Sequence, residues 1–172
     1  GKGWGGGRGA GGAECLVACA LPSQVERPAV WYLAAYTGCF EWRGDLRSAR
    51  GQCEQARSEA TTQSDRQLVA YAQSQCAAVE LDRGDVDAAI ASYQRSQKAA
   101  QDIKDHYFDA VAALSLGQID IGRKRWAAAG EYLKHAIDVF AQTEDAGGEA
   151  NAQGLIGLSY AALEKNAERG RA

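Results

Sequence analysis

Small and apolar residues recur every three or four positions along most of this chain, with charged and amide side chains between them. One such run begins at Leu46 and continues through Ala49, Cys53, Ala56 and Ala60. This spacing places the five side chains on one face of an α-helix. The same spacing predicts six further helical stretches, at about 30–42, 67–82, 86–100, 107–122, 126–140 and 150–164. The pattern therefore predicts seven helices, arranged as three pairs and one single helix.

The chain also repeats itself with a period of forty residues. The stretch "RGDLRSARGQCEQARSEA" begins at Arg43, and "RGDVDAAIASYQRSQKAA" begins at Arg83. Further columns keep the same register, among them Ala49, Ala89 and Ala129, and also Tyr36, Cys76, Leu116 and Ile156. Such self-similarity is the signature of stacked supersecondary units, in which each unit packs on its neighbours.

The repeated Gly-Asp step predicts a tight corner between antiparallel helices. Glycine can take the left-handed conformation that closes a helix C-terminus, and we expect Gly44 and Gly84 to do so. The following Asp45 and Asp85 are expected to cap the next helix with their carboxylates. The third copy departs from this pattern, because Lys124-Arg125 occupy the two places. There, Gly122 is expected to end the helix instead.

Paired helices with small residues after such a corner resemble the tetratricopeptide repeat, and the resemblance covers residues 29–172. Two features depart from the family: the period is 40 residues where the family has about 34, and its closing proline is replaced. The long period is similar to the arrays of kinesin light chains and of sensory domains in bacterial transcription regulators. The consensus positions matched are Leu33, Tyr36, Thr37, Phe40, Ala49, Cys53 and Ala56 in the first copy, Gln73, Cys76, Ala77, Glu80, Ala89, Tyr93 and Ser96 in the second, and Ala113, Leu116, Gly117, Asp120, Ala129, Leu133 and Ala136 in the third.

The resemblance implies an all-α fold, a right-handed helical-repeat solenoid of antiparallel helix pairs. About 3.5 repeats are expected, at about 30–65, 66–105, 106–145 and, in part, 146–172. The resemblance implies a protein-interaction scaffold that binds a peptide or helix of a partner protein on its concave face. The alternative is a sensory or regulatory segment of a larger signalling protein, such as a bacterial transcription regulator.

Transferring the groove positions of the family by register gives a candidate binding face. Family members that clamp a terminal carboxylate use lysine, arginine and asparagine at such positions, and this sequence offers almost none. An acidic C-terminal tail is therefore not the expected ligand, and an apolar or amphipathic segment is. The candidate residues are Trp31, Tyr71, Ser74, Gln75, Leu114, Gln118 and Asn151, and Leu158 follows in the same register.

Composition narrows the picture further. The chain has 172 residues, 46% of them hydrophobic, and a net charge of −3. This suits one soluble domain and gives no reason to expect nucleic acid or a membrane as partner. Residues 1–28 include "GKGWGGGRGAGG", which is expected to be a disordered tail or an expression leftover. The absence of methionine suggests a fragment, a processed product or a recombinant chain.

Five cysteines at irregular spacing predict buried free thiols in a reducing compartment, and hence a cytoplasmic protein. Cys15 and Cys19 are not followed by a second pair at zinc-site spacing. His106 and His135 have no cysteine or carboxylate at a recognisable spacing and are expected to be surface residues. We therefore predict no catalytic residue, no metal site and no cofactor.

Two charged clusters and one apolar helix complete the sequence picture. Glu80, Asp82, Asp85 and Asp87 are expected to be solvated or capping residues, and the cluster 123–126 to pack through its tryptophan. The helix around 150–164 is the first half of a fourth pair. We expect an apolar edge there, and with it either a homo-oligomer or a longer parent chain. The apolar residues concerned are Leu155, Ile156, Leu158 and Leu163.

Overall fold

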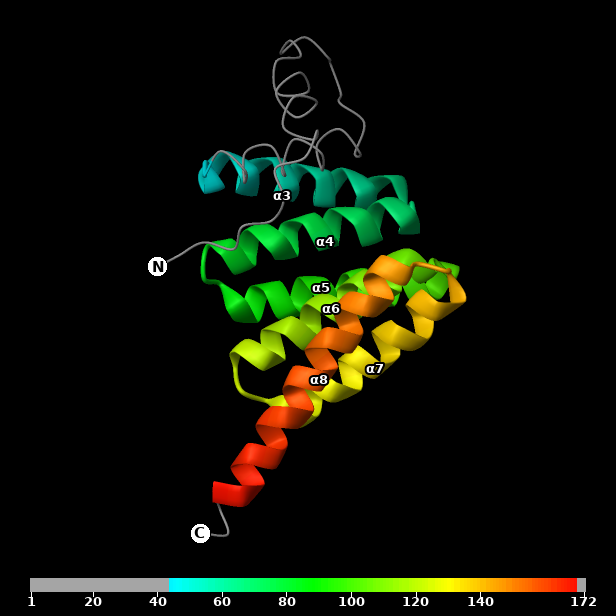
Figure 1. Ribbon diagram of the computed structural model, residues 1–172. Helices are drawn as coiled ribbons and strands as arrows, with labels where there is room; N and C mark the ends of the chain where they lie inside the picture. The colour runs from blue at the N-terminus through cyan, green and yellow to red at the C-terminus, as the bar shows by residue number, and fades with distance from the viewer. Residues whose placement is uncertain (1–43, 170–172) are drawn as a thin grey trace.

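A computed structural model describes residues 44–169, and these residues form a succession of helices without a strand. Consecutive helices pack side by side and reverse direction at each corner (Figure 1). The all-α repeat architecture predicted from the sequence is confirmed. The predicted helix at 30–42, the glycine-rich segment and Trp31 lie outside the described residues. The helices are α3 (Leu46–Gln63), α4 (Arg66–Asp82), α5 (Val86–Ile103), α6 (His106–Gly122), α7 (Trp126–Gln142) and α8 (Ala146–Arg169).

The corners recur every twenty residues, at half the period that the sequence shows most clearly. Each contains one residue with a positive φ, and only two of these are glycines, Gly44 at 76° and Gly84 at 84°. The prediction for both glycines is confirmed. In the third copy of the forty-residue repeat, the helix before the corner ends at Gly122, as expected, but Lys124 takes the left-handed conformation with φ 59°. The other corners use Ser64, Lys104 and Glu144 in the same way.

A shared backbone hydrogen bond explains why these corners tolerate different side chains. The amide of Asp85 donates to the carbonyl of Glu80 at 2.8 Å, and the amide of Arg125 donates to that of Asp120 at the same distance. Asp105 and Asp145 repeat the bond at 2.9 and 3.1 Å. These six-to-one bonds satisfy carbonyls that the helix end would leave unpaired. The corner is therefore made by the backbone.

Aspartate caps most of the helices that follow a corner. Asp45 accepts from the amide of Ser48 at 3.1 Å, and Asp65 accepts from the amides of Gln67 and Leu68 at 2.9 and 3.2 Å. The predicted cap at Asp85 is wrong: its side chain makes no capping bond and instead pairs with Arg83, Nε to Oδ2 at 3.2 Å. A charge-assisted bond to a guanidinium two residues away competes with the backbone amides for this carboxylate.

Alanines and a few larger side chains form the core. Ala49, Ala89 and Ala129, which share one column of the repeat, are all fully buried. Among the described residues, the largest fully buried side chains are Phe140, Leu116 and Leu133. Because small residues occupy the contacts, neighbouring helices approach closely, as predicted for this column.

The two helices of each pair differ in how near they lie to the next pair. The first helices α4, α6 and α8 approach one another in succession. By contrast, α5 has no Cα within 8 Å of a Cα in α3 or α7. We call the side formed by α4, α6 and α8 the first-helix face, and the side formed by α3, α5 and α7 the second-helix face. The wider spacing on the second-helix face leaves room between helices for side chains and hollows.

Candidate functional site

The predicted binding residues within the described part of the chain all lie on the helices of the first-helix face. α4 carries Tyr71, Ser74 and Gln75, α6 carries Leu114 and Gln118, and α8 carries Asn151. Tyr71 and Asn151 are separated by two repeats and therefore occupy equivalent register positions on helices two pairs apart. The fold thus distributes these residues over successive neighbouring helices.

Tyr71 belongs to a small aromatic group at the junction of α4 and α6. Its ring lies 5.7 Å from that of Phe108, and the ring of Phe108 lies 5.3 Å from that of Tyr107 in an edge-to-face contact. Burial raises the pKa of the Tyr71 hydroxyl above its usual value, and the nearby Tyr107 raises it further. Tyr107 itself is 57% exposed. The group therefore offers an aromatic surface that is only partly covered by the protein.

The other predicted residues differ in how much surface they offer. Ser74 is only 8% exposed, and Leu114 packs against the core cluster around Ala113 and Phe140. Gln118 and Asn151 are exposed. Leu158, forty residues after Gln118, is 55% exposed and adds an apolar side chain at the same register. Amide groups and a few apolar side chains therefore dominate the accessible part of this face.

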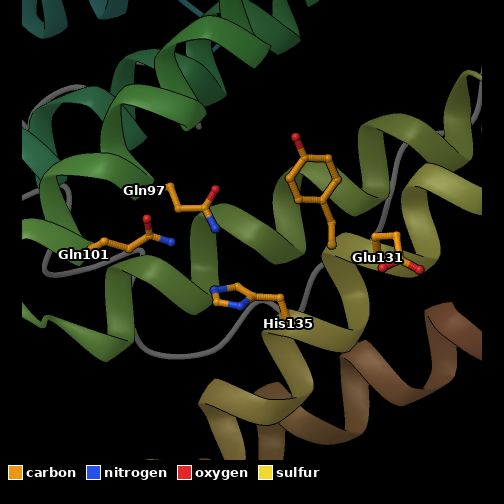
Figure 2. A pocket seen from close by; sticks show the side chains of 5 residues that line it. Gln97, Gln101, Glu131 and His135 are labelled. Atoms are coloured by element: carbon orange, nitrogen blue, oxygen red, sulfur yellow. The ribbon is translucent and has the colours of Figure 1, made fainter.

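The second-helix face contains a hollow of about 270 Å³ between α5 and α7 that was not predicted from the sequence. Figure 2 shows Gln97 and Gln101 on one side and His135 and Glu131 on the other. Tyr132 completes the lining. Asp109 of α6, 7% exposed, joins the two sides, because its Oδ1 accepts from Gln97 Nε2 at 2.9 Å and Gln101 Nε2 at 3.0 Å, and lies 2.9 Å from His135 Nε2.

A second hollow of about 370 Å³ lies between the same two helices. Two ion pairs line it. Arg123 contacts Asp87 at 2.6 Å, and Arg125 pairs with Asp120, whose side chain is 4% exposed. Arg123 and Arg125 of the basic cluster are thus engaged with carboxylates of the chain itself. Asp85 and Asp87 of the predicted acidic patch are also paired with arginines.

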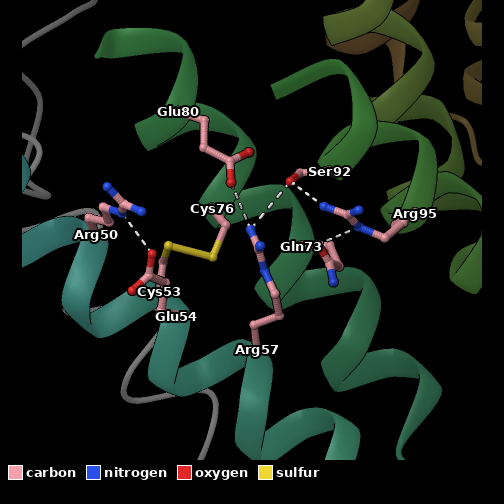
Figure 3. Close-up of a disulfide and its surroundings, with 9 residues drawn as sticks. All are labelled: Arg50, Cys53, Glu54, Arg57, Gln73, Cys76, Glu80, Ser92 and Arg95. Carbon is pink, nitrogen blue, oxygen red and sulfur yellow. Dashed lines mark hydrogen bonds and ion pairs between the residues drawn. A yellow bond between two sulfur atoms is a disulfide. The ribbon is translucent and has the colours of Figure 1, made fainter. Parts of the chain in front are cut away.

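Between α3 and α5, arginine side chains fill the corresponding space. Figure 3 shows Arg57 reaching from α3 to Glu80 and Ser92, with distances of 3.0 and 3.3 Å from its Nη2. Arg95 contacts Ser92 at 3.0 Å and Gln73 at 3.3 Å. A shift of forty residues maps Arg57 onto Gln97 and Arg95 onto His135. The two spaces are therefore equivalent by register, but their polar side chains differ.

Cys53 and Cys76 form a disulfide that joins α3 to α4, with 5.1 Å between their Cα atoms (Figure 3). The expectation of free thiols is wrong for these two residues. They occupy core positions on the sides of α3 and α4 that face each other, and both are almost fully buried. Their separation of 23 residues gave no indication of this pairing, because it depends on how the two helices face each other.

The structure also corrects the interpretation of His135. A carboxylate does lie beside it, that of Asp109, but 26 residues away in sequence. Only the forty-residue register, which aligns His135 with Arg95, points to an inter-helix role. Within residues 44–169 there is no group of three or more histidine, cysteine or acidic side chains arranged to hold a metal ion. In the same range, no helix is both long and apolar enough to cross a membrane.

Comparison with models of known protein families gives a match to part of the chain. Residues 68–140 match the model of the tetratricopeptide repeat, over α4 to α7. No curated protein matches the chain. The matched segment includes both helices of the second and third repeats, whose corners and buried alanines are described above. This part of the chain belongs to the tetratricopeptide repeat family, a non-catalytic family whose repeats generally mediate protein–protein interaction.

Proposed function

We propose that the array captures an apolar or amphipathic segment of a partner protein on its first-helix face. The observation that carries this proposal is the succession of α4, α6 and α8, with Tyr71, Gln118, Asn151 and Leu158 on them. Repeat arrays bind extended segments along the side where equivalent helices approach one another. Exposed amides supply hydrogen bonds to a peptide backbone, and Leu158 and the aromatic group supply apolar contact.

The charge of this face supports the choice of ligand. None of the candidate residues on α4, α6 and α8 is charged: they are Tyr71, Ser74, Gln75, Leu114, Gln118, Asn151 and Leu158. Binding a strongly charged tail would leave its charge without a partner as water is displaced. A helix or extended segment with an apolar side fits better.

Site-specific photo-crosslinking tests this proposal directly. A photoreactive amino acid at position 118 on α6 should crosslink to a partner from the source cell, and the same group at position 58 on α3 should not. Ser58 is an exposed position on the second-helix face and serves as the matched control. Peptide mapping of the crosslinked product then identifies the captured segment.

Substitution provides the second arm of the test. Changing Tyr71 and Gln118 to alanine should weaken capture of that segment, while the far-UV circular dichroism spectrum stays helical. If both variants bind the segment as well as the parent chain, the first-helix face is not the interface. Crosslinking from position 58 alone would lead to the same conclusion.

A further inference from the structure

Side chains that line the hollow between α5 and α7 carry hydrogen-bond acceptors. Carboxylate oxygens accept hydrogen bonds, so the three contacts to Asp109 Oδ1 use the amide nitrogens of Gln97 and Gln101 and an N–H on His135 Nε2. This fixes the orientation of both amides, whose oxygens remain as acceptors. In the neutral ring of His135, Nδ1 is then also an acceptor. In Figure 2 the amide nitrogen of Gln97 points toward His135 and its oxygen points away.

No described residue donates a hydrogen bond to the side-chain oxygens of Gln97 or Gln101, or to Nδ1 of His135. Glu131, at the rim, adds a carboxylate, one oxygen of which lies 3.3 Å from the exposed Lys134. The ring of Tyr132 adds an aromatic surface. The hollow therefore combines several acceptors with an aromatic ring, which suits a ligand with several N–H donors and a positive charge.

A comparison of three carboxylates carried by α4 and α6 gives a second argument. Glu80 pairs with Arg57, and Asp120 pairs with Arg125. Asp109, with its side chain 10% exposed, has hydrogen bonds from two amides and an imidazole, but within the described residues no arginine or lysine contacts it. By register, Gln97 stands where α3 has Arg57. A carboxylate whose contacts include no permanently charged arginine or lysine keeps a negative potential that favours a cation nearby.

We propose that this hollow is a socket for an arginine side chain of a partner protein. A guanidinium is planar, always charged and carries five N–H donors, which match acceptors distributed around a cavity better than the single ammonium of lysine. Its face can stack on the ring of Tyr132. The socket lies on the second-helix face, so this site is separate from the binding site proposed on the first-helix face. A partner could use either site alone or both.

Titration with blocked tripeptides, followed by nuclear magnetic resonance, tests the socket. The probe is acetyl-Gly-Arg-Gly-amide, and the matched control replaces arginine with citrulline, which has nearly the same shape but no charge. The arginine peptide should cause saturable shifts of the side-chain amide signals of Gln97 and Gln101. The lysine peptide should bind more weakly, and the citrulline peptide should cause no such shifts. Equal shifts with arginine and citrulline, or shifts confined to α4, α6 and α8, would overturn the proposal.

Free L-arginine distinguishes a protein side chain from a small-molecule ligand. It carries an ammonium and a carboxylate at Cα, where the peptide has neutral amide groups, so a socket that takes only the side chain should bind it no more tightly than the blocked peptide. Tighter binding of the free amino acid would identify a metabolite site and contradict the assignment to a partner side chain.

Three variants of the protein identify the residues responsible. Gln97→Leu removes one acceptor and should weaken arginine-peptide binding roughly tenfold, as expected for one hydrogen bond to a charged group. Gln94→Leu, the same change one turn earlier on α5 and outside this hollow, should leave binding unchanged. Since Gln97→Leu also removes a donor to Asp109, Glu131→Gln provides a variant at an exposed residue. Glu131→Gln should weaken binding of the arginine peptide severalfold and leave the melting curve unchanged. If both Glu131→Gln and Gln97→Leu bind the peptide as well as the parent chain, the socket proposal is refuted.

Discussion

The ring of Phe140 occupies the space that a Cβ atom on Gly148 would need. An ideal Cβ built there would lie 2.5 Å from Cε1 of the ring, and Phe140 is 2% exposed. The last helix, α8, therefore packs on α7 through bare backbone at this point. Gly147, one residue earlier, faces only the Asp145 carboxylate, at 3.5 Å from the same ideal atom.

Alanine at Gly148 should destabilise the fold, because the buried ring must move to admit the methyl group. We expect a loss of about 1 to 3 kcal/mol in the free energy of unfolding, measured by urea denaturation. Gly147→Ala is the control, and should be neutral or stabilise by up to about 1 kcal/mol through helix propensity. Equal effects of the two changes would mean that Phe140 does not lie against Gly148.

Valine at Gly84 should destabilise through the backbone alone. The residue has φ 84°, and nothing lies within 4 Å of an added Cβ, so the cost of about 1 to 2 kcal/mol comes from a β-branched residue in the left-handed region. Gly130→Ala, inside α7 and equally unobstructed, should stabilise the fold instead. Thermal unfolding of both variants checks the pair. A neutral Gly84→Val would contradict the left-handed corner.

Alanine at Asp65 and at Asp85 should have unequal effects. Asp65 caps α4 with two hydrogen bonds to backbone amides, and its loss should cost about 1 kcal/mol. Asp85 makes no capping bond to α5, and its carboxylate instead forms a surface ion pair with Arg83. Replacing Asp85 should therefore lower the free energy of unfolding by only a few tenths of the loss expected at Asp65. Chemical denaturation distinguishes the two variants. A larger loss of stability at Asp85 than at Asp65 would support the original prediction that Asp85 caps α5.

Folding stability should fall at alkaline pH partly because of Tyr71. Its pKa is raised in the folded protein, chiefly by burial, so the unfolded chain ionises this tyrosine first. The stabilisation from neutral Tyr71 is complete below the unfolded pKa of about 10 and is lost as pH rises through the higher folded value. Tyr71→Phe, which cannot ionise, should lose less stability than the parent chain between about pH 9 and 11. Identical losses in urea titrations would exclude this role for Tyr71.

The outer side of α8 should support self-association. Tyr160 and Leu163 are 45% and 37% exposed there, and exposed apolar edges of stacked repeats are normally covered. We expect a concentration-dependent increase in mass in sedimentation experiments. Leu163→Lys should reduce it, and Asn166→Lys, the same charge change at an exposed polar position, should not. A chain that stays monomeric at high concentration would refute this prediction.

The helices and their order could be predicted because they depend on local spacing. Leu46, Ala49 and Cys53 define one face of a helix whatever the helix packs against. Four predicted helices agree with α4 to α7 to within a few residues. The first-helix face follows in the same way, since register alone determines that Tyr71, Gln118 and Asn151 lie on equivalent helices. Their exposure did not follow: Ser74 is buried by its neighbours, although its register matches the groove.

The corners show the limit of this reasoning at single residues. Gly84 was predicted correctly because glycine is the residue that most readily adopts a positive φ. Lys104, Lys124 and Glu144 adopt it as well, because the six-to-one backbone bond and the packed helices on either side hold the conformation against the intrinsic preference of the side chain. Asp85 failed as a cap because Arg83 competes for its carboxylate.

The sequence by itself determined the repeat, the helical faces and the family, because these depend on the periodic order of small and apolar residues. Only the tertiary structure decided the partners of the polar side chains. The pairs Asp109–His135 and Arg57–Glu80 and the disulfide Cys53–Cys76 join helices through residues 23 to 26 positions apart. Such pairs form or fail according to the spacing and rotation of packed helices. Those quantities are set by the whole array of buried contacts, and no local pattern in the sequence encodes them.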